Sequence, residues 1–344
     1  MTFLKNVWYC AGFAAELRDK PVGRIFLNEE VVLYRGAQSG KAYAVGARCP
    51  HRFAPLSMGT VLGDQIMCGY HGLRFDSAGR CAYNPHGGEV PPQTVLKTYP
   101  LTERAGILWI WMGDPARADV TILPESSFMT DPGYTTFTFY MSVAAQYELV
   151  TDNLLDLTHA PYIHAGTLSN GPAEAVMNHD FSIKGDVIRS NYHTPCEPPS
   201  IWFSKLFEDE LGETFSSMTW HPASRLELDL WMRPIGATDA ERVHTPSHHY
   251  LTPETERTTH YFNAQGRNTR IHDQAATDHA KELIRRGFLD EDAPMIMACQ
   301  EYVGSADLFS LRPAILKTDT PAVQARRIIA KMARQEQEES TSSA

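Results

Sequence analysis

Cys49-Pro-His51 and Cys68-Gly-Tyr-His71 are the two stretches of this 344-residue sequence that decide its fold. Each stretch offers one thiolate and one imidazole, and residues 52–67 between them are long enough to form strands that carry two facing loops. Such a pair of loops would supply two cysteines to one iron atom and two histidines to another, which is the ligand set of one kind of [2Fe-2S] cluster. The spacing therefore predicts an iron–sulfur site in the N-terminal third of the chain.

A zinc site built from the same four residues is the main alternative. Zinc sites with two cysteines and two histidines usually end in a histidine pair about three to five residues apart, and His51 and His71 are not paired in this way. The iron–sulfur interpretation is therefore favoured. Neutral imidazoles in place of two anionic thiolates raise the reduction potential of such a cluster, so it would accept electrons from a low-potential donor.

A second metal pattern lies in Asp152-Asn-Leu-Leu-Asp156-Leu-Thr-His159-Ala-Pro161-Tyr-Ile-His164. Two imidazoles and one carboxylate form the facial triad that binds Fe(II) in non-heme oxygenases. Asp156 and His159 are three residues apart, so a helix would place them on one face. We expect Pro161 to break that helix and bring His164 round to His159. The alternative is a helix with two surface histidines.

Several shorter stretches accompany these patterns: Asn6-Val-Trp-Tyr9, Ala54-Pro-Leu56 and Trp109-Ile-Trp-Met-Gly-Asp-Pro115. Together they resemble the oxygenase component of Rieske non-heme iron oxygenases, in particular the vanillate and dicamba O-demethylase branch, over nearly the whole chain. The resemblance implies one Rieske [2Fe-2S] cluster and one mononuclear Fe(II) per chain. It assigns the cluster to Cys49, His51, Cys68 and His71, and the mononuclear iron to His159, His164 and Asp292.

The sequence alone offers three candidates for the third iron ligand. Asp290 and Glu291 compete with Asp292, and Asp292 could instead cap a helix that starts near Pro294.

The resemblance also implies catalytic roles for Asp156 and Asn153. Asp156 matches a carboxylate that bridges an iron-ligand histidine and a cluster histidine of the neighbouring subunit, in a head-to-tail homotrimer. His249 matches a substrate-binding position, although a hydrogen-bonded core histidine is an equal alternative. Glu227 and Asp229 either face solvent or disfavour an anionic substrate. Four aromatic residues are expected to line a pocket or to belong to the core: Trp202, Phe203, Phe207 and Trp231.

Two domains and a tail are expected. Residues 1–115 contain short strands separated by turn signals, for example at 31–34, 42–45 and 107–111, which predicts an all-β Rieske domain. Residues 116–334 mix strand candidates with helical periodicity at 273–289 and from Thr320 onward, which predicts an α+β catalytic domain around a central antiparallel sheet. Residues 335–344 are expected to form a flexible tail. The fold class is thus α+β.

Charge and composition exclude some classes of binding partner. The net charge is −10, with 31 Lys and Arg against 41 Asp and Glu. A dominant nucleic-acid role is therefore excluded. No apolar run has the length of a membrane span, so no membrane role is expected. Six cysteines are sparse in a chain of this length, which favours a cytoplasmic location.

The resemblance implies a monooxygenase that uses O2 and electrons from NAD(P)H, delivered by a separate reductase or ferredoxin. The expected reaction is O-demethylation of a methoxyaromatic, vanillate-like compound, with release of formaldehyde. Hydroxylation of a methyl group or ring of another aromatic, such as an aryl sulfonate, is the alternative within the family. A Rieske electron carrier with a binding domain and a zinc-stabilised binding module are the rivals outside it.

Overall fold

The computed structural model describes residues 3–171, 178–223, 225–305 and 307–342. The chain divides into two compact units, residues 1–125 with 252–255, and residues 126–251 with 256–344. The division falls ten residues after the expected boundary at 115, and a short segment from late in the chain belongs to the first unit. Leu27 donates its backbone N–H to the Pro253 carbonyl at 2.9 Å and so ties that segment in. Among the described helices, none is both long enough and apolar enough to cross a bilayer.

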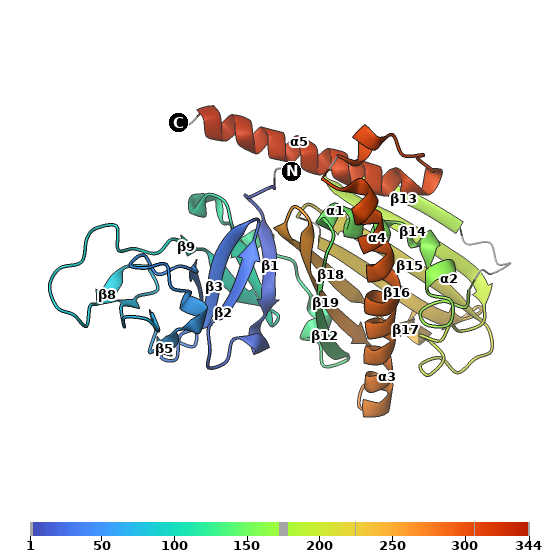
Figure 1. The fold of residues 1–344 in the computed structure, drawn as a ribbon. Helices are drawn as coiled ribbons and strands as arrows, with labels where there is room; N and C mark the ends of the chain where they lie inside the picture. The colour runs from blue at the N-terminus through green and yellow to red at the C-terminus, as the bar shows by residue number, and fades with distance from the viewer. Residues whose placement is uncertain (1–2, 172–177, 224, 306, 343–344) are drawn as a thin grey trace. The chain divides into compact units, whose positions relative to one another are not determined.

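The first unit is all-β, as predicted, and consists of three small sheets (Figure 1). One sheet has the order β1-β11-β10, from Trp8–Phe13, Ile107–Trp111 and Leu101–Arg104. The second has the order β2-β3-β4-β9, from Val22–Phe26, Glu29–Arg35, Ala42–Gly46 and Thr98–Tyr99. The third has the order β5-β6-β7-β8, from Thr60–Leu62, Gln65–Met67, Arg74–Phe75 and Cys81–Tyr83. Short 3-10 turns lie at Ala14–Glu16, Leu56–Met58, Pro115–Arg117 and Val120–Ile122.

The buried core of this unit explains where the two cysteine–histidine loops emerge. Val32, Val45, Ile66 and Phe75 are fully buried side chains from different strands and pack in one cluster. The same cluster includes both cysteines of the first metal pattern, so the loops after β4 and β6 are anchored in the core at their cysteine ends.

In its described residues, the second unit contains one eight-stranded antiparallel sheet and five α-helices, which confirms the predicted α+β class. The strand order is β12-β19-β18-β16-β15-β14-β13, and β17 pairs with β16. The strands are Thr135–Val143, Thr258–Arg267, Ser247–Thr255, Arg225–Pro234, Gly212–His221, Val187–Glu197, Asn178–Lys184 and Val243–His244. The helices are Tyr147–Leu155 (α1), Ala160–Ile163 (α2), Gln274–Arg285 (α3), Ala293–Val303 (α4) and Thr320–Ser342 (α5).

The sheet separates two environments because side chains alternate along its strands. On β16, Leu228 and Leu230 point to one face, whereas Glu227 and Asp229 point to the other. The face that carries the leucines borders an internal cavity, described below. Glu227 and Asp229 therefore face away from it, so the idea that they disfavour an anionic substrate is wrong.

The helix that carries the second metal pattern ends earlier than the sequence suggested. Helix α1 stops at Leu155, and Asp156 leaves the helical region with φ −115° and ψ 90°. A 3-10 turn at Leu157–His159 follows, and Pro161 lies inside the first turn of α2, where it needs no backbone N–H. The prediction that Pro161 breaks the helix is wrong, and the bend lies at Asp156.

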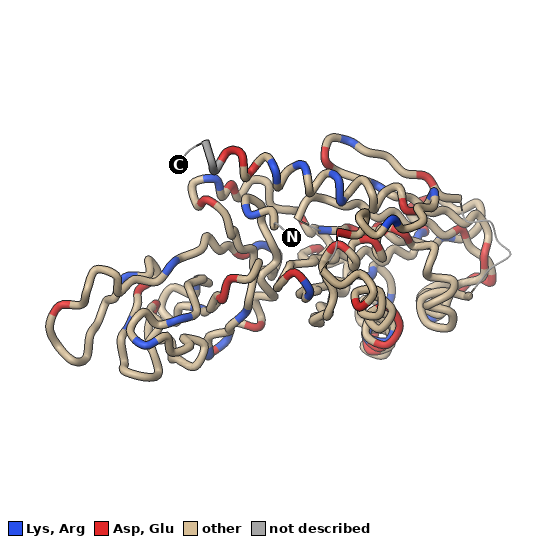
Figure 2. The backbone as a smooth tube through the Cα atoms, turned by 45° about the horizontal axis from the view of Figure 1, so that its top comes forward, with Lys and Arg blue, Asp and Glu red and all other residues tan. Residues whose placement is uncertain are grey.

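Helices α3 and α4 form a single column in Figure 1 because the π-helical segment Arg286–Asp292 joins them without a loop. Helix α5 begins at Thr320 as predicted but continues to Ser342, so most of the expected tail 335–344 is helical instead. Figure 2 shows that Lys and Arg positions recur along α5. Short 3-10 turns complete the unit at Ser127–Met129, Asp239–Glu241, Leu308–Leu311 and Lys317–Asp319.

Candidate metal centres and substrate cavity

The two cysteine–histidine loops of the first unit have the same backbone hydrogen bonds. Cys49 donates to the Ala54 carbonyl at 2.9 Å and accepts from the Phe53 N–H at 2.8 Å. Cys68 likewise donates to the carbonyl five residues on and accepts from the N–H four residues on, which belongs to Gly72. Phe53 and Gly72 both have positive φ, 56° and 74°. The loops are therefore two copies of one tight turn, and each turns its histidine away from the core.

The four side chains fit a [2Fe-2S] cluster with two thiolate and two imidazole ligands. Cys49 and Cys68 are buried, and the rings of His51 and His71 meet edge to face with centroids 4.6 Å apart. The Nδ1 atom of His71 is buried and has no hydrogen-bond partner, as expected of an atom reserved for a metal. Burial, together with the adjacent Cys68 thiol, raises the pKa of the Cys49 thiol to about 11. A thiol of this kind binds a metal such as iron as the thiolate.

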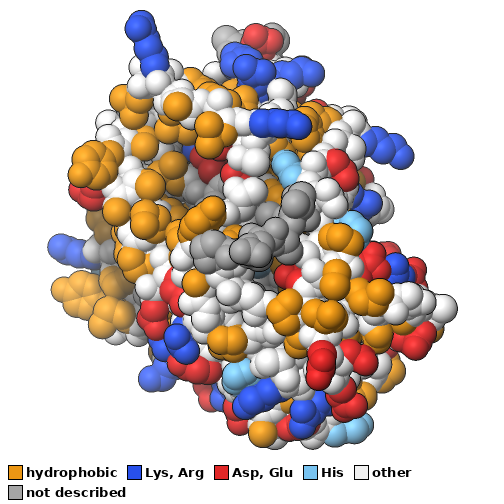
Figure 3. All heavy atoms as spheres, turned by 90° about the vertical axis from the view of Figure 1, so that its right-hand side faces the viewer, with side chains coloured by type: hydrophobic (Ala, Val, Ile, Leu, Met, Phe, Trp, Pro, Cys, Tyr) orange, Lys and Arg blue, Asp and Glu red, His pale blue; other side chains and the backbone are white. Residues whose placement is uncertain are grey.

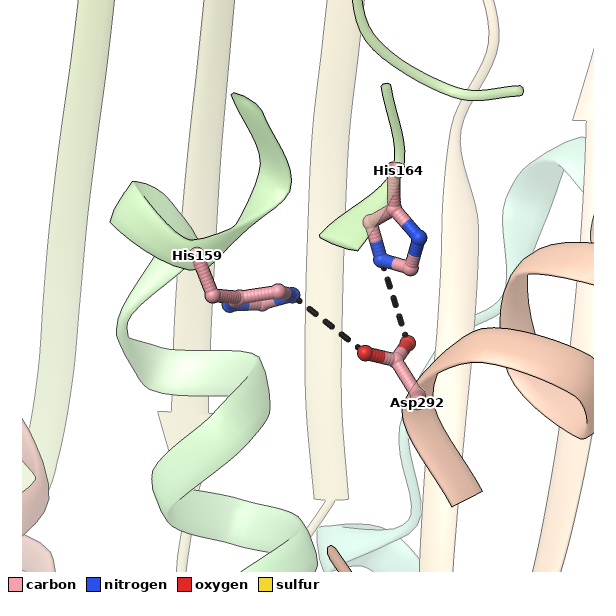
Figure 4. Close-up of side chains that lie close together, drawn as sticks. All are labelled: His159, His164 and Asp292. Carbon is pink, nitrogen blue, oxygen red and sulfur yellow. Dashed lines mark ion pairs between the residues drawn. The ribbon is translucent and has the colours of Figure 1, made fainter. Parts of the chain in front are cut away.

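In the second unit, His159, His164 and Asp292 converge although they come from different segments (Figure 4). Asp292 Oδ1 lies 3.5 Å from His159 Nε2, and Asp292 Oδ2 lies 3.2 Å from His164 Nε2. One ligand atom from each residue falls within 4.8 Å of the other two. Two imidazoles and one carboxylate at this spacing fit a facial Fe(II) site.

Each imidazole of this triad is held by a hydrogen bond from its other nitrogen. His159 Nδ1 donates to the backbone carbonyl of Asp156 at 2.6 Å. His164 Nδ1 donates to Glu291 Oε2 at 2.7 Å, and Thr167 donates to the same oxygen at 2.7 Å. Such partners fix the tautomer and the ring orientation, leaving Nε2 free for a metal. Burial alone would lower the pKa of His164, but Asp292 and Glu291 together raise it, which shows that the pocket favours a cation.

The structure distinguishes the three acidic residues that the sequence left open. Asp290 is exposed and pairs with Arg285, Glu291 contacts the far side of His164, and Asp292 is the one that meets both histidines. Asp292 precedes α4 but makes no side-chain capping hydrogen bond. Asp292 ends the π-helical turn, in which Gly287 packs so closely on Leu168 that an added Cβ would sit 2.8 Å from that side chain. The role of Glu291 as a histidine partner was not predicted, because neither its spacing nor its residue type distinguishes it from a ligand.

The two predicted catalytic residues on and after α1 have different partners. Asn153 Nδ2 donates to Asp292 Oδ1 at 3.1 Å. The Asp156 carboxylate accepts from the backbone N–H and the hydroxyl of Thr158, at 2.9 and 2.5 Å. The resemblance implied that an iron-ligand histidine bonds the Asp156 carboxylate. Within this chain, His159 instead donates to the backbone carbonyl of Asp156.

An internal cavity of about 420 Å³ opens onto the triad. Its wall on the sheet side comes from alternating residues of β14, β15, β16, β18 and β19, and the metal side comes from α1, α2 and the π-helical turn. Trp202 and Phe203 line it as expected, whereas Phe207 and Trp231 do not, and Trp231 stacks on Phe215 instead. Figure 3 shows the side of the second unit that carries α2, where hydrophobic side chains are widespread and Lys and Arg lie mostly toward the edges.

His249 lies in the wall of this cavity and is also a hydrogen-bonded core histidine. Its Nδ1 accepts from the Asn263 amide at 3.2 Å and from the Tyr261 hydroxyl at 2.6 Å, so its Nε2 carries the proton and donates to Ser247 at 2.8 Å. Burial lowers the pKa of His249 to about 3. The imidazole is therefore neutral.

Comparison with known protein families gives two matches. Residues 7–100 match the Rieske [2Fe-2S] domain, and residues 143–335 match the vanillate O-demethylase oxygenase C-terminal domain.

The chain is also similar to individual proteins along its whole length. It is 33% identical to a dicamba O-demethylase oxygenase component from Stenotrophomonas maltophilia, over 96% of this chain and 98% of that one. It is 35% identical to a putative toluene-4-sulfonate monooxygenase iron-sulfur subunit from Comamonas testosteroni, over 87% and 88% of the two chains. A crystal structure of dicamba monooxygenase with non-heme iron and dicamba matches 98% of this chain and 100% of its own, with a TM-score of 0.85 and 32% identity.

Proposed function

The chain belongs to the Rieske non-heme iron oxygenases of the vanillate O-demethylase type, and from this premise we propose that it O-demethylates a methoxyaromatic compound. It is the oxygenase component of a Rieske-type aromatic monooxygenase and works with a separate reductase or ferredoxin. One Rieske [2Fe-2S] cluster and one mononuclear iron are its cofactors.

We assign the cluster to Cys49, His51, Cys68 and His71, and the mononuclear iron to His159, His164 and Asp292. The cluster supplies single electrons, and the mononuclear iron supplies the site at which O2 reacts. The single observation that carries the proposal is that His159, His164 and Asp292 line the same cavity as Trp202 and Phe203. A flat aromatic ring packed on those side chains would present its methoxy group to the metal side.

The reaction balances with the donors that the family uses. One atom of O2 enters a C–H bond of the ArO–CH3 group, and the other leaves as water, with two electrons and two protons from NAD(P)H and the medium. The hydroxylated product, ArO–CH2OH, loses the phenol as formaldehyde forms. The task of the chain is placement of the methyl carbon against the metal side, for which Trp202 and Phe203 of the cavity wall supply a packing surface.

Asp156 is assigned to electron transfer between protomers of a head-to-tail homotrimer. Thr158 holds its carboxylate at 2.5 Å, and its backbone carbonyl holds the iron-side imidazole of His159. A carboxylate fixed in this way can accept a hydrogen bond from a histidine of another protomer. Asp156→Asn should keep both metal centres and the trimer mass by sedimentation, yet lose product formation. Loss of either metal in this variant would instead give Asp156 a structural role.

The experiment that tests the reaction uses the anaerobically purified holoenzyme with a reductase and NADH. Methoxyaromatic compounds are screened while formaldehyde and O2 are measured. Formaldehyde equal to the substrate consumed supports O-demethylation. Hydroxylated products without formaldehyde would replace it by methyl or ring hydroxylation.

A further inference from the structure

The cavity beside the triad has an unusual charge balance for an aromatic-acid site. None of the described residues that line it is Lys or Arg, and residues 172–177, which the structure does not describe, contain neither type in the sequence. The imidazole outside the metal triad, His249, is neutral and already bonded through both nitrogens. A bound anion would therefore find no cationic side chain in the described wall.

A carboxylate stands in the same wall, away from the metal. Glu197 is at the end of β14, where it pairs with Gly212 of β15, and it lines the cavity. Burial raises the pKa of the Glu197 carboxyl, and the neighbouring Thr214 hydroxyl opposes this rise. On the same strand, Tyr192 bonds the Leu157 N–H at the start of the metal-binding turn. Glu197 lies five positions beyond Tyr192 on this strand, roughly 16 Å along an extended chain, with an irregularity between Thr194 and Glu197, and it is not one of the three clustered metal-ligand candidates.

The rest of the polar lining is uncharged. Thr194, Ser216 and Gln265 offer hydroxyl or amide groups between leucine and aromatic side chains. The other carboxylate, Asp292, lies at the metal end, where an iron(II) ion with two neutral imidazoles leaves a local charge of about +1. A substrate that presents its methyl group to the iron has its polar substituent away from that charge, toward groups such as Glu197.

We propose that the substrate of this cavity is an uncharged methoxyaromatic that carries an O–H or N–H group, and that the Glu197 carboxylate accepts a hydrogen bond from this group and rejects aromatic carboxylates and sulfonates. This inference rests on the proposed function for the reaction at the methyl group, and on the cavity alone for the charge of the substrate. An anion placed here would lose its hydration without gaining a cationic partner and would face a second negative charge. A neutral donor keeps the Glu197 oxygens satisfied.

A matched pair of probes isolates the charge. Vanillyl alcohol and vanillate share one methoxyphenol skeleton and differ in a hydroxymethyl group against a carboxylate. Binding to the anaerobic holoenzyme is measured by titration calorimetry, and turnover by formaldehyde release with a reductase and NADH. We expect vanillyl alcohol to bind at least about tenfold more tightly, the size of effect that one hydrogen bond to a charged group commonly has.

Glu197→Gln then tests the residue. The amide keeps the shape and an acceptor but removes the charge and adds a donor, so vanillate binding should improve about tenfold while vanillyl alcohol changes by only a few-fold. Asp229→Asn is the control, because it removes a carboxylate from the opposite face of the same sheet. It should leave the ratio of the two affinities unchanged.

The outcomes separate this inference from the proposed reaction. Tighter binding of vanillate by the wild-type protein, or an unchanged ratio in a folded Glu197→Gln protein, overturns the inference. The wild-type comparison does this even if the variant does not fold. Preferential binding of vanillyl alcohol with hydroxylated product and no formaldehyde supports the inference and overturns O-demethylation.

Discussion

Asn153 donates its side-chain amide to Asp292 Oδ1 at 3.1 Å, across 139 residues of sequence. The amide reaches the carboxylate because α1 ends at Leu155, with Asn153 in its last turn beside the metal triad. The same Asn153 nitrogen lies 3.5 Å from His159 Nε2. A carboxylate with one oxygen engaged by an amide presents the other to a metal, and we infer that Asn153 positions Asp292 as a ligand through one oxygen.

Asn153→Ala should therefore weaken the binding of the mononuclear iron and leave the cluster content unchanged. Loss of an outer partner of a metal ligand typically reduces metal affinity about 10- to 100-fold. Iron content after dialysis against a weak chelator, measured beside the visible absorbance of the cluster, checks this. Asn191→Ala, which removes an amide bonded to Asp180 on β13, is the control. Equal iron retention in both variants would contradict the positioning role.

Substitutions at the three consecutive acidic residues 290–292 are expected to affect iron binding to three different degrees. Asp292→Asn should abolish mononuclear iron binding, because it removes the one carboxylate that meets both histidines. Glu291→Gln should retain iron with about tenfold lower affinity, since the amide still accepts from His164 but no longer carries charge. Asp290→Asn should match the wild-type protein, because Asp290 is an exposed partner of Arg285. Iron analysis of the three proteins checks the order, and a larger loss in Asp290→Asn than in Asp292→Asn would reverse our ligand assignment.

The sequence was most informative where a pattern is local. Short strands between turn signals identified the all-β first unit, and the helical spacing at 273–289 identified α3. The π-helical turn after Arg285 was not predictable, because its wider turn depends on tertiary contacts such as the close approach of Gly287 to Leu168. The helical end of the chain was also missed. Its polar composition resembles a solvated tail, yet a long helix that is already anchored by packing continues easily at little cost.

The site residues also divide into those that a local sequence pattern indicates and those that only the folded structure brings together. The paired loops and the two histidines at 159 and 164 are recognisable from spacing, and Asp292 came only from the resemblance. The bend at Asp156 was misplaced to Pro161, because proline is well tolerated in the first turn of a helix and the sequence does not show where that turn begins. Glu197 carries no motif at all. Its importance depends on the absence of Lys and Arg among the described lining residues, and only a folded cavity shows this.

Substitution of Arg326 is expected to lower the stability of the protein strongly. It is buried on α5, donates through two nitrogens to Asp152, and pairs with Glu148 at 2.8 Å, both on α1. Burial would raise the pKa of both carboxyls further without this cation. Arg326→Met should lower the free energy of unfolding by about 3–5 kcal/mol, because it leaves two carboxylates without their partner.

Urea denaturation at pH 7 checks the Arg326 prediction. Arg327→Met, which changes the neighbouring residue on the same helix, is the control. Combining Arg326→Met with Asp152→Asn should recover part of the loss, since the buried charge is then removed. A double variant less stable than the sum of the two single effects would contradict the charge argument.

Protonation of Glu227 is expected to lower the stability of the protein at acid pH. Burial would raise the pKa of its carboxyl, but the neighbouring His221, His248 and Arg225 lower it to about 2. Arg225 Nε lies 3.2 Å from Glu227 Oε1, and His221 Nε2 lies 3.7 Å from the same oxygen. Since the ordinary value is 4.5, the folded state binds this proton less readily than the unfolded state. Its contribution is therefore complete above about pH 4.5 and is lost as the pH falls toward 2. We expect roughly 2 kcal/mol to be lost over this window, after allowance for partial exposure.

The thermal unfolding temperature, measured between pH 7 and pH 3, should therefore fall more steeply for the wild-type protein than for Glu227→Gln. The variant has no proton to gain at this position. At pH 7 the variant should be the less stable of the two, and the curves should approach each other as the pH falls. Any acid loss of the cluster affects both proteins equally, so the difference between them reports the carboxylate. Glu301→Gln, which removes an exposed partner of Arg257, should follow the wild-type curve, because such surface pairs contribute little. Parallel curves for the wild-type protein and Glu227→Gln would show that His221 and Arg225 do not hold this carboxylate ionised.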